Sequence, residues 1–258
     1  MTAIKKYWYL VVVSVLLIVW VIGNIYIASV IKTTFFTPEW SRESLVTGYT
    51  TKKVDIGDGQ SIEARTFLSR SSPEIVLYLS GTVGPIDMIV DAVSRTQNLI
   101  YPIYPGYAGT SGKPTQQNIY ASADKTLEML LETGYTQNNI TVVGHSLGGQ
   151  NALQLARKYP NLKKYVLINA LISPKESCDV LYPTLCTFAD SNFLNADRVI
   201  PTEKVKNLVY VQAKYDDIIN LNSAQKLFDK IPAVQKKYVL ISGEHGSFPI
   251  SKILEIEL

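Results

Sequence analysis

One serine stands between two glycines at the point where an apolar run gives way to a helix-forming segment. The sequence Gly-His-Ser-Leu-Gly occupies residues 144–148, with Ser146 at its centre. The β-branched run 139–143 predicts a strand before it, and residues 150–158 predict a helix after it. A serine on such a sharp turn projects its hydroxyl above a sheet, and the glycines let the helix approach the strand closely. The pattern therefore indicates a serine nucleophile.

A serine hydroxyl becomes a good nucleophile only when a base takes its proton. The chain has two histidines, His145 and His245. His145 is adjacent to Ser146 on the same sharp turn, so its ring should point away from the hydroxyl and pack under the turn. His245 follows the strand-like run 238–241 and lies on a loop. We therefore predict that His245 is the base.

A carboxylate is needed to hold the imidazole in the correct tautomer and to stabilise its protonated form. Two adjacent candidates, Asp216 and Asp217, follow the apolar run 206–213. This run predicts a buried strand, and its end should lie at the same sheet edge as the serine and the histidine. These residues alone do not decide which of the two aspartates is the acid.

The serine turn, the histidine loop and the strands before them resemble the α/β-hydrolase superfamily over roughly residues 54–248. The resemblance implies an acid in a G-x-x-D-x-x-V/I loop, which residues 213–219 match with Ala213 in place of the first glycine. That alignment selects Asp216 as the acid and keeps Asp217 in reserve.

The same resemblance implies two backbone amides that stabilise an oxyanion. Leu147, directly after the serine, supplies the first. The second lies in the loop after an early strand, here the apolar run 74–79, and we select Thr82. Ser80 stands where the family usually has the histidine of an HG pair.

A further segment, residues 103–115, is similar to the Y-x-G-Y-G-x-S-x-G-x-P-[ST] loop of membrane-anchored α/β-hydrolase-domain serine hydrolases, which include bacterial relatives described as serine aminopeptidase-like. It departs at two positions, with Ala108 for glycine and Thr110 for serine. This group implies hydrolysis of esters or thioesters more strongly than of peptides.

The expected fold is an α/β-hydrolase fold, a mainly parallel sheet with helices on both faces. An antiparallel hairpin at 49–56 and 60–68 should open it, and helices are expected at about 86–95 and from about 115. Alternation breaks after residue 169, and the resemblance places a short lid at about 171–203. That stretch has no clear helical or strand period, and we expect Tyr182, Phe188 and Phe193 in it to bind substrate.

Residues 7–31 are apolar and carry no charge. As a helix they would be about 37 Å long, enough to cross about 30 Å of hydrocarbon with some tilt. A cleaved signal peptide is the alternative, but its apolar region is shorter and ends in small residues. We expect a membrane anchor over 1–32, a linker over 33–46 and one hydrolase domain over 47–258.

The lysines and arginines on the two sides of this segment are nearly balanced. Since long domains translocate largely regardless of charge, we expect the domain outside the cytoplasm, in the periplasm or at the cell surface. Cys178 and Cys186 are the only cysteines, and in an oxidising compartment they would tend to form a disulfide, although two unpaired buried thiols are equally consistent with the sequence.

Composition excludes several other classes. There are 25 Lys and Arg against 22 Asp and Glu, a net charge of +3, with no basic stripe that would indicate nucleic-acid binding. No metal or cofactor motif is present, and the sequence does not indicate an oligomeric state.

We therefore expect a membrane-anchored serine hydrolase that acts on a small or lipid-like acyl ester or thioester through an acyl-enzyme on Ser146. Two alternatives stay open: an aminopeptidase-like peptide hydrolase, and a catalytically inactive hydrolase fold that serves as a binding module.

Overall fold

The computed structural model describes residues 2–34, 47–68, 72–82, 93, 97–108, 110–182, 184–248, 253 and 256–258. Its strands are β1 (Thr50–Gly57), β2 (Gln60–Phe67), β3 (Ile75–Leu79), β4 (Asn98–Ile103), β5 (Ile140–His145), β6 (Lys164–Ile168), β7 (Val205–Ala213) and β8 (Ala233–Ile241). Its α-helices are α1 (Thr2–Thr34), α3 (Gln116–Glu132), α4 (Leu147–Lys158), α5 (Pro174–Leu181) and α6 (Leu221–Lys230), and short 3-10 turns cover Gln137–Asn139 and Ala196–Arg198.

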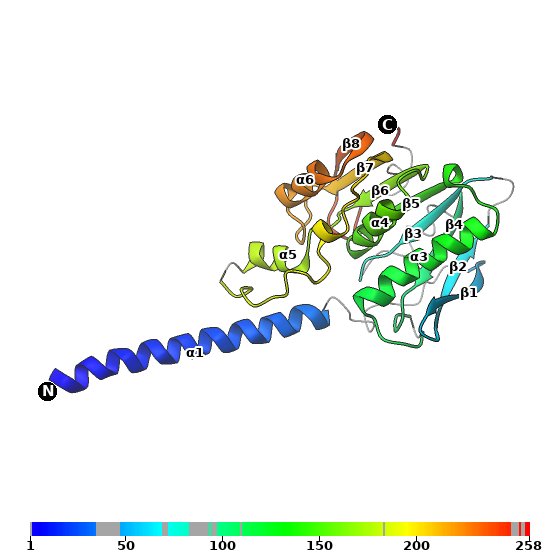
Figure 1. Cartoon of the computed structure of the whole chain (residues 1–258). Coiled ribbons are helices and arrows are strands. Elements are labelled where there is room, and N and C mark those ends of the chain that lie inside the picture. Colours follow the sequence, from blue (N-terminus) through cyan, green and yellow to red (C-terminus); the bar gives the residue numbers. More distant parts are fainter. Residues whose placement is uncertain are drawn as a thin grey trace.

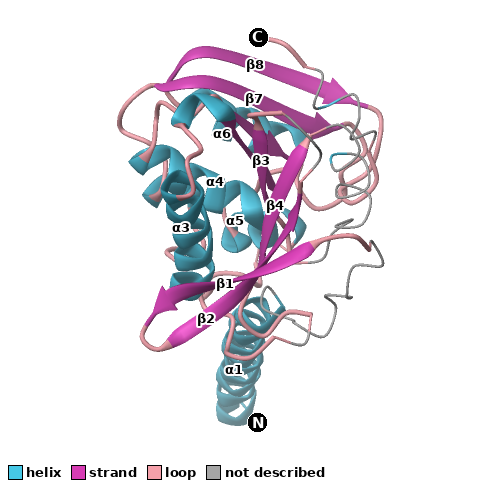
Figure 2. Ribbon diagram, turned by 90° about the vertical axis from the view of Figure 1, so that its right-hand side faces the viewer, coloured by secondary structure: helices cyan, strands magenta, loops and turns pink. Residues whose placement is uncertain are grey.

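The eight strands form one sheet in the order β1-β2-β4-β3-β5-β6-β7-β8 (Figures 1 and 2). β1 and β2 form the expected antiparallel hairpin, and β2 also runs antiparallel to β4. Every other neighbouring pair is parallel. The expected mainly parallel sheet is therefore confirmed.

Residues of the central strands alternate between two apolar cores. In β3, Ile75, Leu77 and Leu79 pack in one cluster with residues of α3, α4 and α6. Val76 and Tyr78 point to the opposite face and join a second cluster, as the two-residue period of a strand requires. Figure 2 shows α3, α4 and α6 together on one side of the sheet.

The second cluster includes Val93 and Ile253, both in helical conformation. The rest of the helix expected at 86–95 lies outside the described residues, as does most of the expected linker at 33–46.

The lid differs from the expectation of an irregular segment, because it contains α5. Ser173 caps this helix by accepting a hydrogen bond from the amide of Glu176 at 3.0 Å, and Pro174 occupies its first turn, where no amide hydrogen is needed. A single eight-residue helix is too short for its hydrophobic period to stand out in the sequence.

Cys178 and Cys186 form a disulfide whose Cα atoms are 6.0 Å apart. Of the two possibilities that the sequence left open, the structure contains the bridged form. It closes a small loop at the end of α5.

The first helix, α1, projects away from the sheet (Figure 1). Its segment Tyr7–Ile31 is long and apolar enough to cross a membrane, and only 6% of the residues in its most hydrophobic part are buried. This is the apolar segment that the sequence predicts as an anchor.

Candidate active site

Ser146 lies on a sharp turn between β5 and α4. Its backbone has φ 53° and ψ −116°, a conformation that residues other than glycine rarely adopt. The turn is held because the Ser146 amide donates to the carbonyl of Ile168 at 2.9 Å. A Cβ atom on Gly148 would lie 1.9 Å from the carbonyl oxygen of Leu79, so only glycine lets α4 pack this closely on β3. The expected strand–turn–helix arrangement is therefore present.

Ser146, His245 and Asp216 are joined by hydrogen bonds although they come from three separate loops. The Nε2 atom of His245 lies 3.0 Å from the Oγ atom of Ser146. Its Nδ1 atom lies 2.9 Å and 3.0 Å from the two carboxylate oxygens of Asp216. The loops follow β5, β7 and β8, whose carboxyl ends meet at one edge of the sheet because these strands are parallel.

Asp216 is fixed by three further donors. The amides of Ile218 and Ile219 donate to its Oδ1 atom at 2.9 and 2.8 Å, and the Gln212 side chain donates to Oδ2 at 3.1 Å. Burial alone would raise the pKa of Asp216, but the hydrogen bond and charge of His245, together with the two amides, lower the pKa below its ordinary value. The carboxylate is therefore ionised at neutral pH and can stabilise a protonated imidazole.

Asp217, by contrast, is exposed. The geometry thus places Asp216, the residue selected from the loop pattern, against the histidine.

The backbone of His245 is clamped by two side chains that also line the sheet edge. The Nε2 atom of His145 and the Nδ2 atom of Asn169 each lie 2.9 Å from the His245 carbonyl oxygen. Since a carbonyl only accepts, Nε2 of His145 carries the hydrogen. Asn169 also accepts from the amide of Ala213 at 2.8 Å and so connects the ends of β6 and β7 with the histidine loop.

His145 is fully buried under the turn, as expected. Burial, and secondarily the charge of His245, lower the pKa of His145 to about 4. The ring is therefore neutral at physiological pH, which suits a structural donor rather than a base.

The two predicted oxyanion donors flank Ser146. Leu147 is the first residue of α4, and amides in the first turn of a helix have no partner within it. Thr82 lies in the turn after β3, next to Gly81, where an added Cβ atom would lie 3.1 Å from Cβ of Ser146. The loop that carries Thr82 therefore runs directly beside the nucleophile.

A buried network positions that loop. Asn151 on α4 donates to the hydroxyl of Tyr104 at 2.7 Å, and this hydroxyl donates to the carbonyl of Ser80 at 3.3 Å. Burial raises the pKa of Tyr104 far above its ordinary value, so the hydroxyl keeps its hydrogen. The helix after Ser146 thus fixes the loop that carries Thr82.

The three lid residues predicted to bind substrate lie in different environments. Tyr182 and Phe188 are 56% and 46% exposed, whereas Phe193 is partly buried against the second core cluster. The ring of Phe188 packs on Trp20 of α1. Their role in substrate binding stays a prediction.

The base of the lid is tied to the site by Gln150, one turn after the nucleophile. Its side-chain amide donates to the carbonyls of Leu171, Ile172 and Leu194. Nothing in the local sequence pattern marks Gln150, Asn151 or Asn169, because their partners are distant in the chain.

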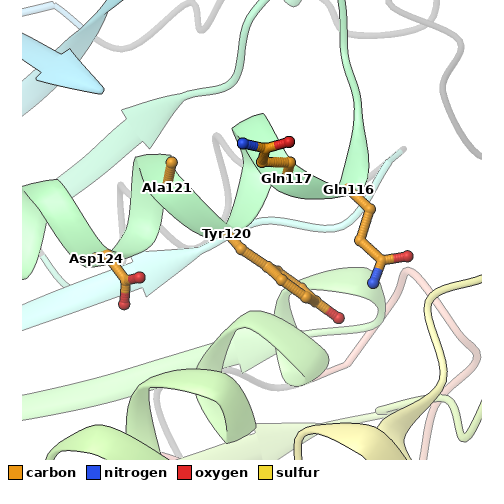
Figure 3. A pocket seen from close by; sticks show the side chains of 5 residues that line it. All are labelled: Gln116, Gln117, Tyr120, Ala121 and Asp124. Carbon is orange, nitrogen blue, oxygen red and sulfur yellow. The ribbon is translucent and has the colours of Figure 1, made fainter. Parts of the chain in front are cut away.

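A hollow of about 530 Å³ lies on α3 and is lined by Gln116, Gln117, Tyr120, Ala121 and Asp124 (Figure 3). None of the three hydrogen-bonded site residues lines it. In Figure 3, Tyr120 points from α3 toward α4, where its hydroxyl lies 3.4 Å from the side-chain oxygen of Gln150. The hollow therefore lies beside α4 near Gln150, and Ser146 does not line it.

These features are those of the α/β-hydrolase fold. The family model of the alpha/beta hydrolase fold matches residues 75–186, from β3 through the nucleophile to the second cysteine of the lid. The match confirms both the expected fold and the resemblance to the superfamily.

Among particular proteins, the chain is 24% identical over 190 residues to an uncharacterized membrane protein of Saccharomyces cerevisiae, which covers 70% of this chain and 67% of the relative. It is 26% identical over 129 residues to human alpha/beta hydrolase domain-containing protein 17B, covering 49% of this chain and 43% of that protein. The chain therefore matches less than half the length of the human relative.

Solved structures give the same fold. The esterase Pf2001 of Pyrococcus furiosus superposes with a TM-score of 0.63 at 13% identity, covering 83% of this chain and 90% of the esterase. At this identity the likeness concerns the fold alone.

Proposed function

We propose that the protein is a membrane-anchored serine hydrolase that cleaves carboxylic ester or thioester bonds. The observation that carries the proposal is the continuous chain of hydrogen bonds from Ser146 through His245 to Asp216. Acyl transfer on a serine requires a nucleophile, a base and an acid that orients the base, in this geometry.

In this proposal His245 takes the Ser146 proton on Nε2 as Oγ attacks the acyl carbon. The amides of Leu147 and Thr82 donate to the negative oxygen that forms, and Asp216 stabilises the protonated imidazole. The proton then passes to the departing alkoxide or thiolate, leaving an acyl group on Ser146. Water, deprotonated by His245, hydrolyses this ester and restores the serine.

The proposal places α1 across a membrane and the hydrolase domain outside the cytoplasm. The length and exposure of Tyr7–Ile31 support the first part. The Cys178–Cys186 disulfide supports the second, because disulfides persist in oxidising compartments and are rare in the cytosol.

Covalent labelling with a fluorophosphonate probe tests the enzymatic part, since the probe requires an activated serine. We expect the full chain to be labelled and the Ser146→Ala variant to stay unlabelled. Equal and negligible labelling of both would indicate an inactive hydrolase fold. Parallel assays with p-nitrophenyl esters and aminoacyl p-nitroanilides then separate ester hydrolysis from the peptidase alternative.

A further inference from the structure

One polar residue of α1 is buried, although most of the described side chains of this helix are exposed. Asn24 is 0% exposed, whereas neighbours such as Ile22 and Ile25 are 60% and 58% exposed. Trp20 lies four residues before Asn24, and the less exposed Ile31 lies seven after it, so all three share one helical face. Trp20 and Asn24 on this face contact the domain.

Asn24 and Trp20 bind a short segment of the lid, residues 184–188, here called the lid tip. The Asn24 amide donates to the Thr184 carbonyl at 3.4 Å, and its oxygen accepts from the Thr187 amide at 3.0 Å. The Trp20 indole donates to the same Thr184 carbonyl at 3.1 Å, and its ring lies edge-on to Phe188, with centroids 5.6 Å apart. Figure 1 shows the loop after α5 beside α1.

The contact lies well inside the apolar segment of α1. Asn24 precedes the Ile31 end of the Tyr7–Ile31 segment by seven residues, about 10 Å of helix. A bilayer has about 30 Å of hydrocarbon, so a helix of this length places Asn24 below the headgroups on the side of the domain. A lid tip that binds Asn24 must then lie at the same depth.

The lid tip and the residues on either side of it have the composition that this depth requires. No charged residue occurs from Val180 to Ala189. Tyr182 and Phe188 expose apolar rings, and the disulfide at Cys186 restrains the loop.

The hydrogen bonds lower the cost of placing this loop in lipid. Backbone groups outside helices and sheets are tolerated at membrane depth only where protein satisfies them. Asn24 and Trp20 satisfy the carbonyl of Thr184 and the amide of Thr187. The bond from Thr187 satisfies the side-chain oxygen of Asn24, whose amide nitrogen also donates to the Trp20 carbonyl within α1 at 2.9 Å.

We infer that the lid tip inserts into the bilayer that α1 spans, with α1 as its docking partner and membrane hydrocarbon as the surface it contacts. The inference rests on the proposed function, because it requires α1 to be a retained membrane span. In this arrangement the anchor fixes the orientation of the lid toward the membrane, besides holding the domain near it.

Photo-crosslinking in vesicles tests this insertion. The full chain, reconstituted in phosphatidylcholine–phosphatidylglycerol vesicles, would carry a benzophenone amino acid at Tyr182, and in a second protein at Phe188. Val234, which is 68% exposed at the start of β8, provides the matched control position. We expect phospholipid adducts, detected by mass spectrometry, at the two lid positions and only background at Val234.

Asn24→Leu tests the docking itself, with Ile25→Leu on the exposed face as its control. Loss of hydrogen bonds between membrane segments should release the lid tip and lower the Tyr182 adduct yield about tenfold, while Ile25→Leu leaves it unchanged. Unaltered turnover of a soluble p-nitrophenyl ester would show that the Asn24→Leu domain is folded.

The inference would be overturned if phospholipid adducts at both lid positions stay at background. If that protein also resists carbonate extraction and reacts with the fluorophosphonate probe, the proposed function stays intact. An unchanged Tyr182 yield in Asn24→Leu would overturn the docking role of α1. Release of the wild-type chain by carbonate, or absence of probe labelling, would instead contradict the proposed function.

Discussion

Asp216 and Asp217 are adjacent and chemically identical, and yet their surroundings differ completely. Asp216 accepts hydrogen bonds from two amides, one glutamine and the imidazole of His245, whereas Asp217 is exposed. A carboxylate held by four donors has a fixed direction, which is what an acid that orients a histidine requires. Substitution of Asp217 therefore provides a control for substitution of Asp216, the proposed acid.

We predict that Ser146→Ala and His245→Ala each abolish ester hydrolysis, with losses in kcat on the order of 10⁶, because the residues of such a triad act as a unit. Asp216→Asn should remove most of the activity, since the neutral amide no longer stabilises the imidazolium. Asp217→Asn should have little effect. Steady-state kinetics on one p-nitrophenyl ester measure all four, and a larger loss in Asp217→Asn than in Asp216→Asn would reverse the assignment of the acid.

The buried His145 predicts a pH dependence of stability. Its pKa is about 4 in the folded protein and 6.5 ordinarily. Between these values the unfolded chain binds a proton that the folded chain does not, so stability falls as pH falls from about 6.5 to about 4. A difference of this size corresponds to roughly 3 kcal/mol.

His145→Gln keeps an amide donor and does not titrate. The wild-type melting temperature, relative to that of this variant, should drop by roughly 5 to 10 °C from pH 6.5 to pH 4. Thermal unfolding of both full chains in the same detergent measures the difference. A constant difference across this range would show that His145 is not held neutral in the folded state.

At the scale of elements, the close packing of α4 on β3 and β5 sets the position of Ser146. A Cβ atom on Gly148 would lie 1.9 Å from the carbonyl oxygen of Leu79 and 2.9 Å from that of Ser80. Both are backbone atoms of the strand end that leads into the loop of Thr82. Any side chain at this position must therefore push the helix away from the sheet.

We predict that Gly148→Ala destabilises the domain by at least about 3 kcal/mol, the upper range for overpacking a core, and lowers probe labelling of Ser146. Gly246→Ala is the matched control, because nothing lies within 4 Å of a Cβ atom placed there. Chemical denaturation of the two variants in detergent compares them directly. Similar stabilities would mean that α4 adjusts its position without cost.

Several elements of this fold could be predicted because their signals are local, whereas the short helix α5 could not. The strand run before Ser146, the helix after it and the alternating hairpin at the start each follow from neighbouring residue types. The resemblance to the α/β-hydrolase superfamily then selected Ser146, Asp216 and His245 as the candidate site. Gln150 and Asn169 could not be predicted in the same way. Each is a polar residue whose partners come from strands and loops far away in the chain, and no local period records such contacts.

The contact between α1 and the lid was missed for the same reason. Asn24 reads in the sequence as one polar interruption of an apolar run, and its partners Thr184 and Thr187 lie some 160 residues later. An isolated amide within a membrane segment is nevertheless a signal, since such groups are costly in hydrocarbon and generally face protein.

At the scale of the whole molecule, the proposed arrangement predicts how the protein fractionates. A helix of the length of Tyr7–Ile31 holds the domain by burial of apolar surface, which salt does not screen, whereas electrostatic adhesion is screened. The full chain should therefore stay with membranes through high salt and carbonate and be released by detergent. A mature amino terminus near Ser29 would instead show that the segment is a cleaved signal peptide.

The proposed orientation of the domain can be tested through the disulfide and through access to protease. If the domain lies outside the cytoplasm, protease added to intact cells or spheroplasts should digest it, and a thiol reagent should modify Cys178 and Cys186 only after reduction. A cytosolic domain would be protected until lysis, and its two cysteines would react without a reductant because the cytosol keeps thiols reduced. The two readouts are independent, since one reports access of a protease to the folded domain and the other reports the redox state of a buried pair. Protection from protease combined with free thiols would place the site on the cytoplasmic face, with the lid tip directed toward the inner leaflet.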